Sequence, residues 1–275
     1  MTIGFMQGRL SPIIDGKIQA FPWNFWEDEF LIANKIGLKI MEWTLDYERI
    51  YENPIMLADG QKKILKLCKD YEISIESLTA DCFMQNPFWK SKGVENNILK
   101  STFIDVINSA ISIGIKFIVV PLVDNGSIEN DDQENDLISF LKINEKLFSN
   151  NNIKILFESD YEPKKLKFFI ERFNSKNFGI NYDIGNSAAN GFSVQEEFLA
   201  YGKYILNVHV KDRLLGGSTV PLGEGNADFE LVFNYLKNYG YGGNYIMQTA
   251  RAPDNDHSGV LEFYSKKIRS WIENY

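Results

Sequence analysis

Four side chains of the types that bind metal ions stand near the ends of successive apolar runs in the second half of the chain. They are Glu158 in IKILFES, Asp183 in FGINYDI, His209 in ILNVHV and Gln248 in NYIMQT. Each follows several apolar residues, where an ionised group is costly without a charge partner. Oxygen and imidazole ligands without a thiolate suit Mn²⁺, Mg²⁺, Co²⁺ or Zn²⁺. We therefore predict that these four residues bind one divalent metal ion. The alternative is that each residue only caps the end of a strand.

Such residues meet only if the strands that carry them end at one place. Eight β-rich apolar runs cover residues 2–7, 38–43, 73–79, 116–122, 153–159, 178–184, 205–210 and 244–249. Between them lie helical patterns, which include residues 26–36, 56–71, 95–113, 132–149, 164–173, 229–239 and 258–271. Strands that alternate with helices favour parallel βαβ units, and nearly uniform apolar runs are typical of strands buried on both faces.

Eight βα units in a chain of 275 residues predict a single-domain (β/α)₈ TIM barrel that spans residues 1–275. A doubly wound sheet is the alternative, but the first strand lacks the GxGxxG nucleotide fingerprint. Active sites of TIM barrels form at the carboxyl ends of the strands. The barrel therefore predicts that the four metal-binding candidates converge.

The composition and charge of the chain argue against some classes of binding partner. Hydrophobic residues make up 44% of the chain, and the net charge of −8 argues against a nucleic-acid partner. No apolar run reaches the roughly 18 residues that a membrane helix needs, which predicts no membrane partner. Cys68 and Cys82 form no CxxC pair, and the amino terminus lacks a signal-peptide pattern. These features predict a cytoplasmic protein, and a homo-oligomer is left open.

Six motifs, spread over nearly the whole chain, occur in the order and spacing of a known superfamily. They are GFMQGRLSP (4–12), FESD (157–160), NYDIGNSA (181–188), VHVKDR (208–213), PLGEGNADF (221–229) and MQTAR (247–251). On these motifs the chain resembles the xylose isomerase-like barrels of the sugar phosphate isomerase/epimerase superfamily. The resemblance implies a small-molecule substrate, a sugar or a sugar phosphate.

The resemblance also implies one catalytic divalent metal ion, bound by a glutamate, an aspartate, a histidine and usually a second glutamate. These positions match Glu158, Asp183, His209 and, as a departure, Gln248. Enzymes of this kind interconvert ketoses and aldoses or invert a carbon next to a carbonyl, through an enediolate that the metal ion stabilises. Glu158 would double as the base. An amide has no useful acid–base chemistry near neutral pH, so Gln248 disfavours inversion by a symmetric glutamate pair. A one-base shift by Glu158 on one face stays open, and so does a different acid such as Lys211 or Asp81.

Three charged residues follow His209 directly and are expected on the catalytic face. Lys211 and Arg213 are candidates to bind substrate hydroxyls or a phosphate, and Asp212 is a candidate to orient His209. The alternative is a solvated loop of mixed charge.

Other polar residues at predicted strand ends offer further contacts. Asn186 lies where similar enzymes place a substrate contact, and Arg9 suits a carboxylate or a phosphate, with a structural ion pair as the alternative. For Glu42 and Asp81 we favour loop capping over sugar binding. Arg251 is open to the same two interpretations as Arg9.

Two loops and the second histidine complete the candidates. The aromatic segment 18–26 would either stack on a sugar, or pack under its own loop or at a subunit contact. The glycine-rich segment 214–225 would either present N–H groups to an anion or form a flexible turn. His257 is expected at a solvated helix start, without a functional role.

Three other functions compete with the isomerase or epimerase. A lyase would expel a β-hydroxyl from the same enediolate and dehydrate a keto-polyol. An endonuclease of the same fold group needs many histidines, and two histidines with a net charge of −8 argue against it. A non-catalytic sugar-binding barrel gains support from Gln248, which replaces an acid.

Overall fold

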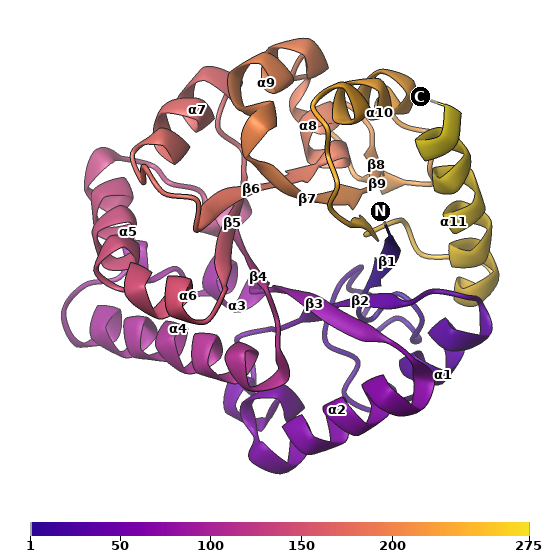
Figure 1. Ribbon diagram of the computed structural model, residues 1–275, viewed down its shortest axis with the longest axis horizontal. Helices are drawn as coiled ribbons and strands as arrows, with labels where there is room; N and C mark the ends of the chain where they lie inside the picture. The colour runs from indigo at the N-terminus through magenta and orange to yellow at the C-terminus, as the bar shows by residue number, and fades with distance from the viewer. Residues whose placement is uncertain (1, 275) are drawn as a thin grey trace.

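The computed structural model of the protein describes residues 2–274, among which eight parallel strands close into a barrel in the order β1-β10-β7-β6-β5-β4-β3-β2 (Figure 1). The strands of the barrel are β1 (Ile3–Met6), β2 (Ile40–Thr44), β3 (Ser74–Thr79), β4 (Phe117–Leu122), β5 (Lys154–Ser159), β6 (Phe178–Asp183), β7 (Ile205–Val210) and β10 (Tyr245–Met247). This closed order confirms the (β/α)₈ TIM barrel and rules out the open doubly wound sheet. The predicted domain limits, residues 1 and 275, lie just outside the described residues.

Helices form a ring around the outer side of the barrel (Figure 1). The α-helices of the described residues are α1 (Asp28–Lys35), α2 (Ala58–Tyr71), α3 (Asp81–Gln85), α4 (Gly93–Ile113), α5 (Asp131–Ile143), α6 (Glu145–Asn150), α7 (Pro163–Glu171), α8 (Ile184–Asn190), α9 (Val194–Tyr201), α10 (Phe229–Asn238) and α11 (His257–Asn274), of which α3 and α8 lie at one end of the barrel. Five short 3₁₀ turns lie in the loops among the described residues: η1 (Ile50–Glu52), η2 (Pro54–Met56), η3 (Phe88–Lys90), η4 (Asp124–Gly126) and η5 (Gly202–Tyr204). A short antiparallel hairpin follows β7. Its two strands, β8 (Asp212–Arg213) and β9 (Thr219–Val220), have two residues each.

The structure differs from the expected elements in several places, of which two bear on the site. The predicted helix 132–149 is divided at Asn144 into α5 and α6. The helices α8 and α9 between β6 and β7 are absent from the helical patterns in the sequence. Their segment opens with IGNSAAN, whose small polar residues carry no clear apolar stripe, and Gly191, with φ of 69°, ends the first of the two helices.

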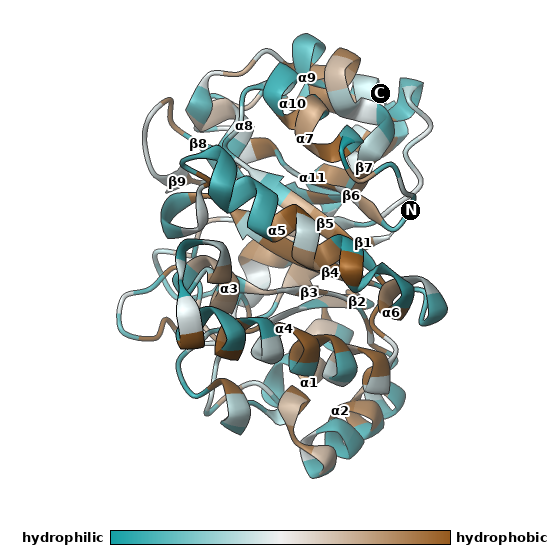
Figure 2. Cartoon of the chain, turned by 90° about the vertical axis from the view of Figure 1, so that its left-hand side faces the viewer, coloured by the Kyte–Doolittle hydropathy of each residue, from teal (hydrophilic) through white to brown (hydrophobic). Residues whose placement is uncertain are grey.

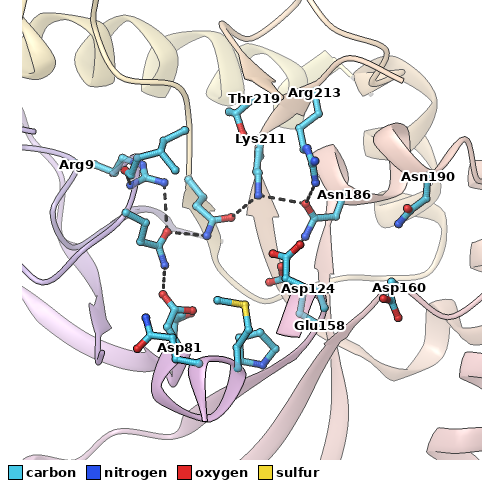
Figure 3. A pocket seen from close by; sticks show the side chains of 18 residues that line it. Arg9, Asp81, Asp124, Glu158, Asp160, Asn186, Asn190, Lys211, Arg213 and Thr219 are labelled. Carbon is cyan, nitrogen blue, oxygen red and sulfur yellow. Dashed lines mark hydrogen bonds between the residues drawn. The ribbon is translucent and has the colours of Figure 1, made fainter. Parts of the chain in front are cut away.

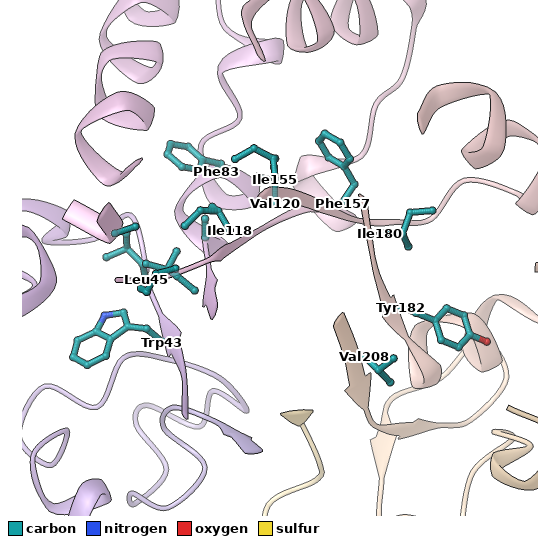
Figure 4. Close-up of a cluster of buried hydrophobic side chains, with 14 of the residues drawn as sticks. Trp43, Leu45, Phe83, Ile118, Val120, Ile155, Phe157, Ile180, Tyr182 and Val208 are labelled. Carbon is teal, nitrogen blue, oxygen red and sulfur yellow. The ribbon is translucent and has the colours of Figure 1, made fainter. Parts of the chain in front are cut away.

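The hydrophobic core lies between the strands and the helices. Side chains such as Ile118, Phe157 and Val208 point from the strands toward the surrounding helices (Figure 4). Successive residues of a strand face opposite sides, so the intervening residues point into the barrel. There, Met6, Ile40 and Ile246 form a small separate apolar cluster.

The opposite end of the barrel interior is polar. In the register of the sheet Asp183 pairs with His209, and Glu42 pairs with Ser77. Figure 2 places α3, α8, β8 and β9 at one end of the barrel and the amino terminus at the other. The carboxyl ends of the strands thus carry the polar residues and the loops that surround them, as a TIM barrel requires.

The aromatic segment 18–26 packs largely beneath its own loop. Phe21 and Trp26 are buried, and both rings contact Trp43 of β2. The prediction for His257 is wrong in one respect. This residue begins α11 as expected, but it is buried at 5% exposure, and its Nδ1 accepts a hydrogen bond from the backbone N–H of Ala252.

Candidate functional site

Three of the predicted metal ligands lie together inside the barrel. Glu158 comes from β5, Asp183 from β6 and His209 from β7, and one ligand atom from each lies within 4.8 Å of the other two. His209 Nδ1 is 3.1 Å from Glu158 Oε2 and 4.0 Å from Asp183 Oδ2. All three side chains are buried. The three neighbouring strands therefore bring two carboxylates and an imidazole to one point.

The orientation of His209 is set by residues on two other strands. Its Nε2 lies 2.7 Å from Glu42 Oε1, and Asn181 Nδ2 lies 3.0 Å from its Nδ1. Burial alone would lower the pKa of His209, but the charge of Glu42 and hydrogen bonds to Glu158 and Glu42 raise this pKa to about 10. The imidazole is thus held between two carboxylates, with Nδ1 directed toward the other two candidate ligands.

Glu42 is a buried structural partner of the site, which differs from the loop cap favoured from the sequence. Its carboxylate accepts hydrogen bonds from Ser77 Oγ at 2.5 Å, Thr79 Oγ1 at 2.6 Å and Asn207 Nδ2 at 2.9 Å. Burial would raise the pKa of Glu42, but the charge of His209 and the hydrogen bonds with His209, Ser77 and Thr79 lower it. Glu42 therefore stays ionised and presents a fixed acceptor to the ring of His209.

The donor set fits a divalent cation. Three carboxylates, those of Glu42, Glu158 and Asp183, stand around one imidazole in a buried space, and buried negative charge requires a cation. A histidine ligand commonly donates its second ring N–H to a carboxylate, as His209 Nε2 does to Glu42. Nitrogen and carboxylate oxygen donors suit Mn²⁺, Mg²⁺, Co²⁺ and Zn²⁺.

We expect Glu42→Gln to weaken binding of a divalent metal by about 10- to 100-fold, the usual cost of losing such an outer partner. The amide still accepts a hydrogen bond but no longer supplies the charge that makes His209 a stronger ligand. Competition with a chelator measures the affinity. The matched control is Glu76→Gln. Glu76 is another glutamate of the barrel strands, and its carboxylate pairs with the exposed Lys116. Equal affinities of the two variants would contradict this role of Glu42.

The amide of Gln248 faces two polar neighbours rather than a carboxylate. Its Oε1 accepts a hydrogen bond from Lys211 Nζ at 3.3 Å, and its Nε2 donates to Gln19 Oε1 at 2.8 Å. Lys211 Nζ is also 3.2 Å from Asp183 Oδ2. Gln248 thus lies beside the group formed by Glu158, Asp183 and His209, connected to it through Lys211.

Asn186, Lys211 and Arg213 form one contact group at the edge of the site. Asn186 Nδ2 donates to Glu158 Oε1 at 2.6 Å, and Asn186 Oδ1 accepts from Arg213 Nη1 at 2.8 Å and from Lys211 Nζ at 3.2 Å. Gly185 permits this packing, because a Cβ at its position would lie 2.7 Å from Lys211 Cγ. The structure therefore joins Asn186 directly to the candidate base, and joins Lys211 and Arg213 to it through Asn186.

The prediction that Asp212 orients His209 is wrong. Its carboxylate accepts hydrogen bonds from the backbone N–H groups of Gly223, Gly225 and Ala227 at 2.8, 3.0 and 3.1 Å. A Cβ at position 225 would lie 2.2 Å from Asp212 Oδ1, so glycine is required there. The glycine-rich loop does present N–H groups to an anion, but that anion is the chain's own Asp212.

A polar pocket of about 450 Å³ opens above this group (Figure 3). Arg9, Lys211 and Arg213 contribute positive charge to its lining, and Asp81, Asp124, Glu158 and Asp160 contribute negative charge. This volume lies within the roughly 300–1,000 Å³ of ordinary small-molecule sites. The pocket therefore has the size and polarity of a site for a small polar molecule.

Arg9 lines the pocket but is already engaged. It is 2% exposed, and its Nη1 and Nη2 donate to Ile18 O and Gln19 Oε1. Arg251 donates to the backbone carbonyls of Gly8 and Ser11. Arg251 therefore stabilises the loop after β1 by bonding its backbone. Arg9 also bonds residues of this loop, and in addition it lines the pocket.

Two polar residues of the site were missed in the sequence. Asn181 Nδ2 bonds both Glu158 Oε2 and His209 Nδ1, and Gln19 bonds Gln248 and Asp81. The two-residue period of a strand puts Asn181 on the same face as Asp183, which would have identified it. Gln19 lies in a loop, where no periodic signal exists.

Comparison with known proteins establishes the family. Residues 30–267 match the model of the xylose isomerase-like TIM barrel family. Because this match covers most of the chain, the protein belongs to that family.

Curated relatives are sugar-phosphate epimerases. The L-ribulose-5-phosphate 3-epimerase UlaE of Escherichia coli O1:K1 / APEC is 37% identical over 102 residues, which cover 37% of this chain and 34% of that protein. The chain thus matches only about a third of the length of that relative. The UlaE protein of Escherichia coli strain SMS-3-5 is 24% identical over 263 residues, which cover 90% of this chain and 89% of the relative.

Solved structures agree in fold. The IOLI protein with a bound zinc atom superimposes with a TM-score of 0.76 at 15% identity, over 100% of this chain and 99% of that one. D-psicose 3-epimerase with D-tagatose, from Clostridium cellulolyticum H10, gives a TM-score of 0.73 at 12% identity, over 99% and 98% of the two chains. Within residues 2–274, none of the helices has the length and apolar character needed to span a membrane.

Proposed function

We propose that the protein is a divalent-metal-dependent isomerase or epimerase that acts on a sugar or a sugar phosphate. The observation that carries this proposal is the group of Glu158, Asp183 and His209, whose ligand atoms lie within 4.8 Å of one another beneath a polar pocket. The names of the curated relatives, which are L-ribulose-5-phosphate 3-epimerases, support the same class of substrate.

In this proposal Glu158, Asp183 and His209 hold the ion, with Gln248 as the fourth ligand. When bound, the ion acts as a Lewis acid toward the carbonyl and the neighbouring hydroxyl of the substrate. Glu158 takes the proton from the carbon next to the carbonyl. Asn181 and Asn186 donate hydrogen bonds of 2.9 and 2.6 Å to its two oxygens and so fix the orientation of its carboxylate.

The positive side chains of the pocket would orient the substrate. Lys211 and Arg213 already bond Asn186 Oδ1, and a phosphate or hydroxyl oxygen would compete for the same donors. Arg9 would contribute charge from the opposite side of the pocket, where its guanidinium is held by Ile18 and Gln19 (Figure 3). Asn186 would fix Glu158 relative to the substrate.

The proposal is tested with purified protein that has been analysed for metal and loaded with Mn²⁺. Incubation with L-ribulose 5-phosphate in deuterated water should place deuterium on the carbon next to the carbonyl, as followed by proton NMR. D-Tagatose and D-psicose serve as non-phosphorylated probes. If none of these ketoses exchanges a proton under metal-loaded conditions, the proposed activity is wrong.

Gln248 provides a second test of the metal ligands. We expect Gln248→Ala to weaken metal binding, because it removes an oxygen donor, and Gln248→Glu to retain or tighten it, because it restores a negative ligand. Chelator competition measures both affinities. Unchanged affinity and unchanged turnover in Gln248→Ala would mean that Gln248 only caps its strand.

Dehydration of a keto-polyol is the second candidate, and Gln248 is the observation that favours it. A glutamine cannot return a proton to the enediolate, whereas loss of a β-hydroxyl needs no second proton transfer to that carbon. Only dehydration yields a conjugated carbonyl, so ultraviolet absorbance of the product distinguishes the two reactions.

A further inference from the structure

Asp81 holds a position in the pocket that the proposed reaction does not yet use. It is the first residue of α3, two positions after the end of β3 at Thr79, it is 7% exposed, and it lines the pocket together with Glu158. Its Oδ2 accepts a hydrogen bond of 2.6 Å from Gln19 Nε2. Among the described residues, no hydrogen bond to its Oδ1 is found.

Asp81 is connected to the position of the missing acid. Gln19 donates to Asp81 and accepts from Gln248 Nε2 at 2.8 Å, so these three side chains form one hydrogen-bonded row. Figure 3 shows Asp81 on the side of the pocket that carries Arg9, whereas Asn186 and Arg213 lie with Glu158 on the other side. Asp81 and Glu158 therefore reach the pocket from different sides.

The surroundings of Asp81 favour its neutral form. Burial raises its pKa to about 8, and the charges of Asp46 and Glu158 act in the same direction, while the hydrogen bond from Gln19 and the charge of His209 oppose them. Arg9 is a further positive charge near this carboxyl. A carboxylic acid that stays protonated near neutral pH can donate a proton.

We propose that Asp81 is the acid that returns a proton to the substrate on the face opposite Glu158, in place of the glutamate that Gln248 has replaced. This inference rests on the proposed function and assigns the reaction to inversion at one carbon, that is, to an epimerase. Gln19 then acts as a positioning residue, because it holds the carboxyl of Asp81 beside Gln248.

Each proton that leaves one group in the proposed inversion is taken up by another. Glu158 carboxylate breaks the C–H bond and gains the proton, and its electron pair passes into the enediolate. The O–H bond of Asp81 then breaks, its proton forms a new C–H bond on the opposite face, and Asp81 is left as a carboxylate. Glu158 loses its proton to water and Asp81 regains one from water through the open pocket. The new hydrogen on the substrate therefore comes from solvent.

The test compares Asp81→Asn with wild type, both loaded with Mn²⁺ and supplied with L-ribulose 5-phosphate in deuterated water. Asparagine still accepts the hydrogen bond from Gln19 but has no proton to give. We expect inversion to fall by about 10²- to 10⁴-fold, the usual contribution of a general acid. Exchange of the α-proton through Glu158 and the metal content should persist. Asp59→Asn, an exposed aspartate on α2 paired with Lys62, is the matched control and should match wild type.

Two readouts separate an acid from a merely structural residue. Asp81→Glu should regain part of the inversion rate, since it restores a carboxylic acid. An infrared carbonyl band of a protonated carboxyl should be present in wild type near neutral pH and absent from Asp81→Asn. Inversion, but not exchange, should fall as pH rises through the pKa of Asp81. That limb lies at or below about pH 8, because a bound cation stabilises the carboxylate.

The outcomes are distinct. Inversion at the wild-type rate in Asp81→Asn would overturn the role of Asp81 and leave the proposed function standing. Loss of exchange together with inversion in Asp81→Asn, at unchanged metal content, would also overturn it, because the residue would then support the whole site. The absence of any exchange in wild type would overturn the proposed function and this inference with it.

Discussion

Replacing Glu158 with Gln should reduce proton exchange at the carbon next to the substrate carbonyl by at least about 10²- to 10⁴-fold, the range that a positioned base contributes. The amide keeps an oxygen that can face a metal ion, but it cannot accept the proton. Deuterium incorporation into L-ribulose 5-phosphate at saturating Mn²⁺ measures the loss. Saturating metal ensures that a weaker site does not imitate the loss of the base.

The matched control is Glu162→Gln, which changes an exposed glutamate just before α7 and should leave exchange intact. Exchange in Glu158→Gln at the rate of this control would show that another residue removes the proton. Because Asn181 and Asn186 each donate to Glu158, the circular dichroism and melting temperature of both variants should be compared with wild type.

Replacing His209 with Ala should remove most of the metal from the purified protein. The imidazole supplies the nitrogen donor of the group, and it lies 3.1 Å from Glu158 and 4.0 Å from Asp183. Loss of an outer partner alone costs about 10- to 100-fold in affinity, so loss of the ligand itself should cost more. Elemental analysis after dialysis measures the metal that remains.

Thermal unfolding gives an independent readout of the same prediction. A ligand at 100 times its dissociation constant stabilises the folded state by about 2.7 kcal/mol, so Mn²⁺ should raise the melting temperature of wild type but not of His209→Ala. His257→Ala alters the second histidine of the chain, which is buried and bonds Ala252 rather than a candidate ligand, and it should keep its metal. Equal metal content in the two variants would contradict a ligand role for His209.

The alternating strand and helix patterns were enough to predict the barrel and the three strand ends that meet in its interior. Eight alternating units leave few topologies, and parallel strands of a barrel present their carboxyl ends on one face. Glu158, Asp183 and His209 could therefore be placed together from local pattern alone, before any contact between them was known. Lys211 and Arg213 could be predicted on the same face of the barrel, because they lie only a few residues beyond His209.

The hydrogen-bond partners of these residues depend on the folded barrel and could not be predicted from local pattern. The contact of His209 with Glu42 joins positions 167 residues apart, and the row of Asp81, Gln19 and Gln248 joins three separate strand ends and loops. Asp212, adjacent in sequence to the histidine motif, turns instead to the backbone of its own loop. Secondary-structure periodicity specifies the face on which a side chain lies. Which hydrogen-bond partner it reaches depends on register, loop path and burial, which only the closed barrel establishes.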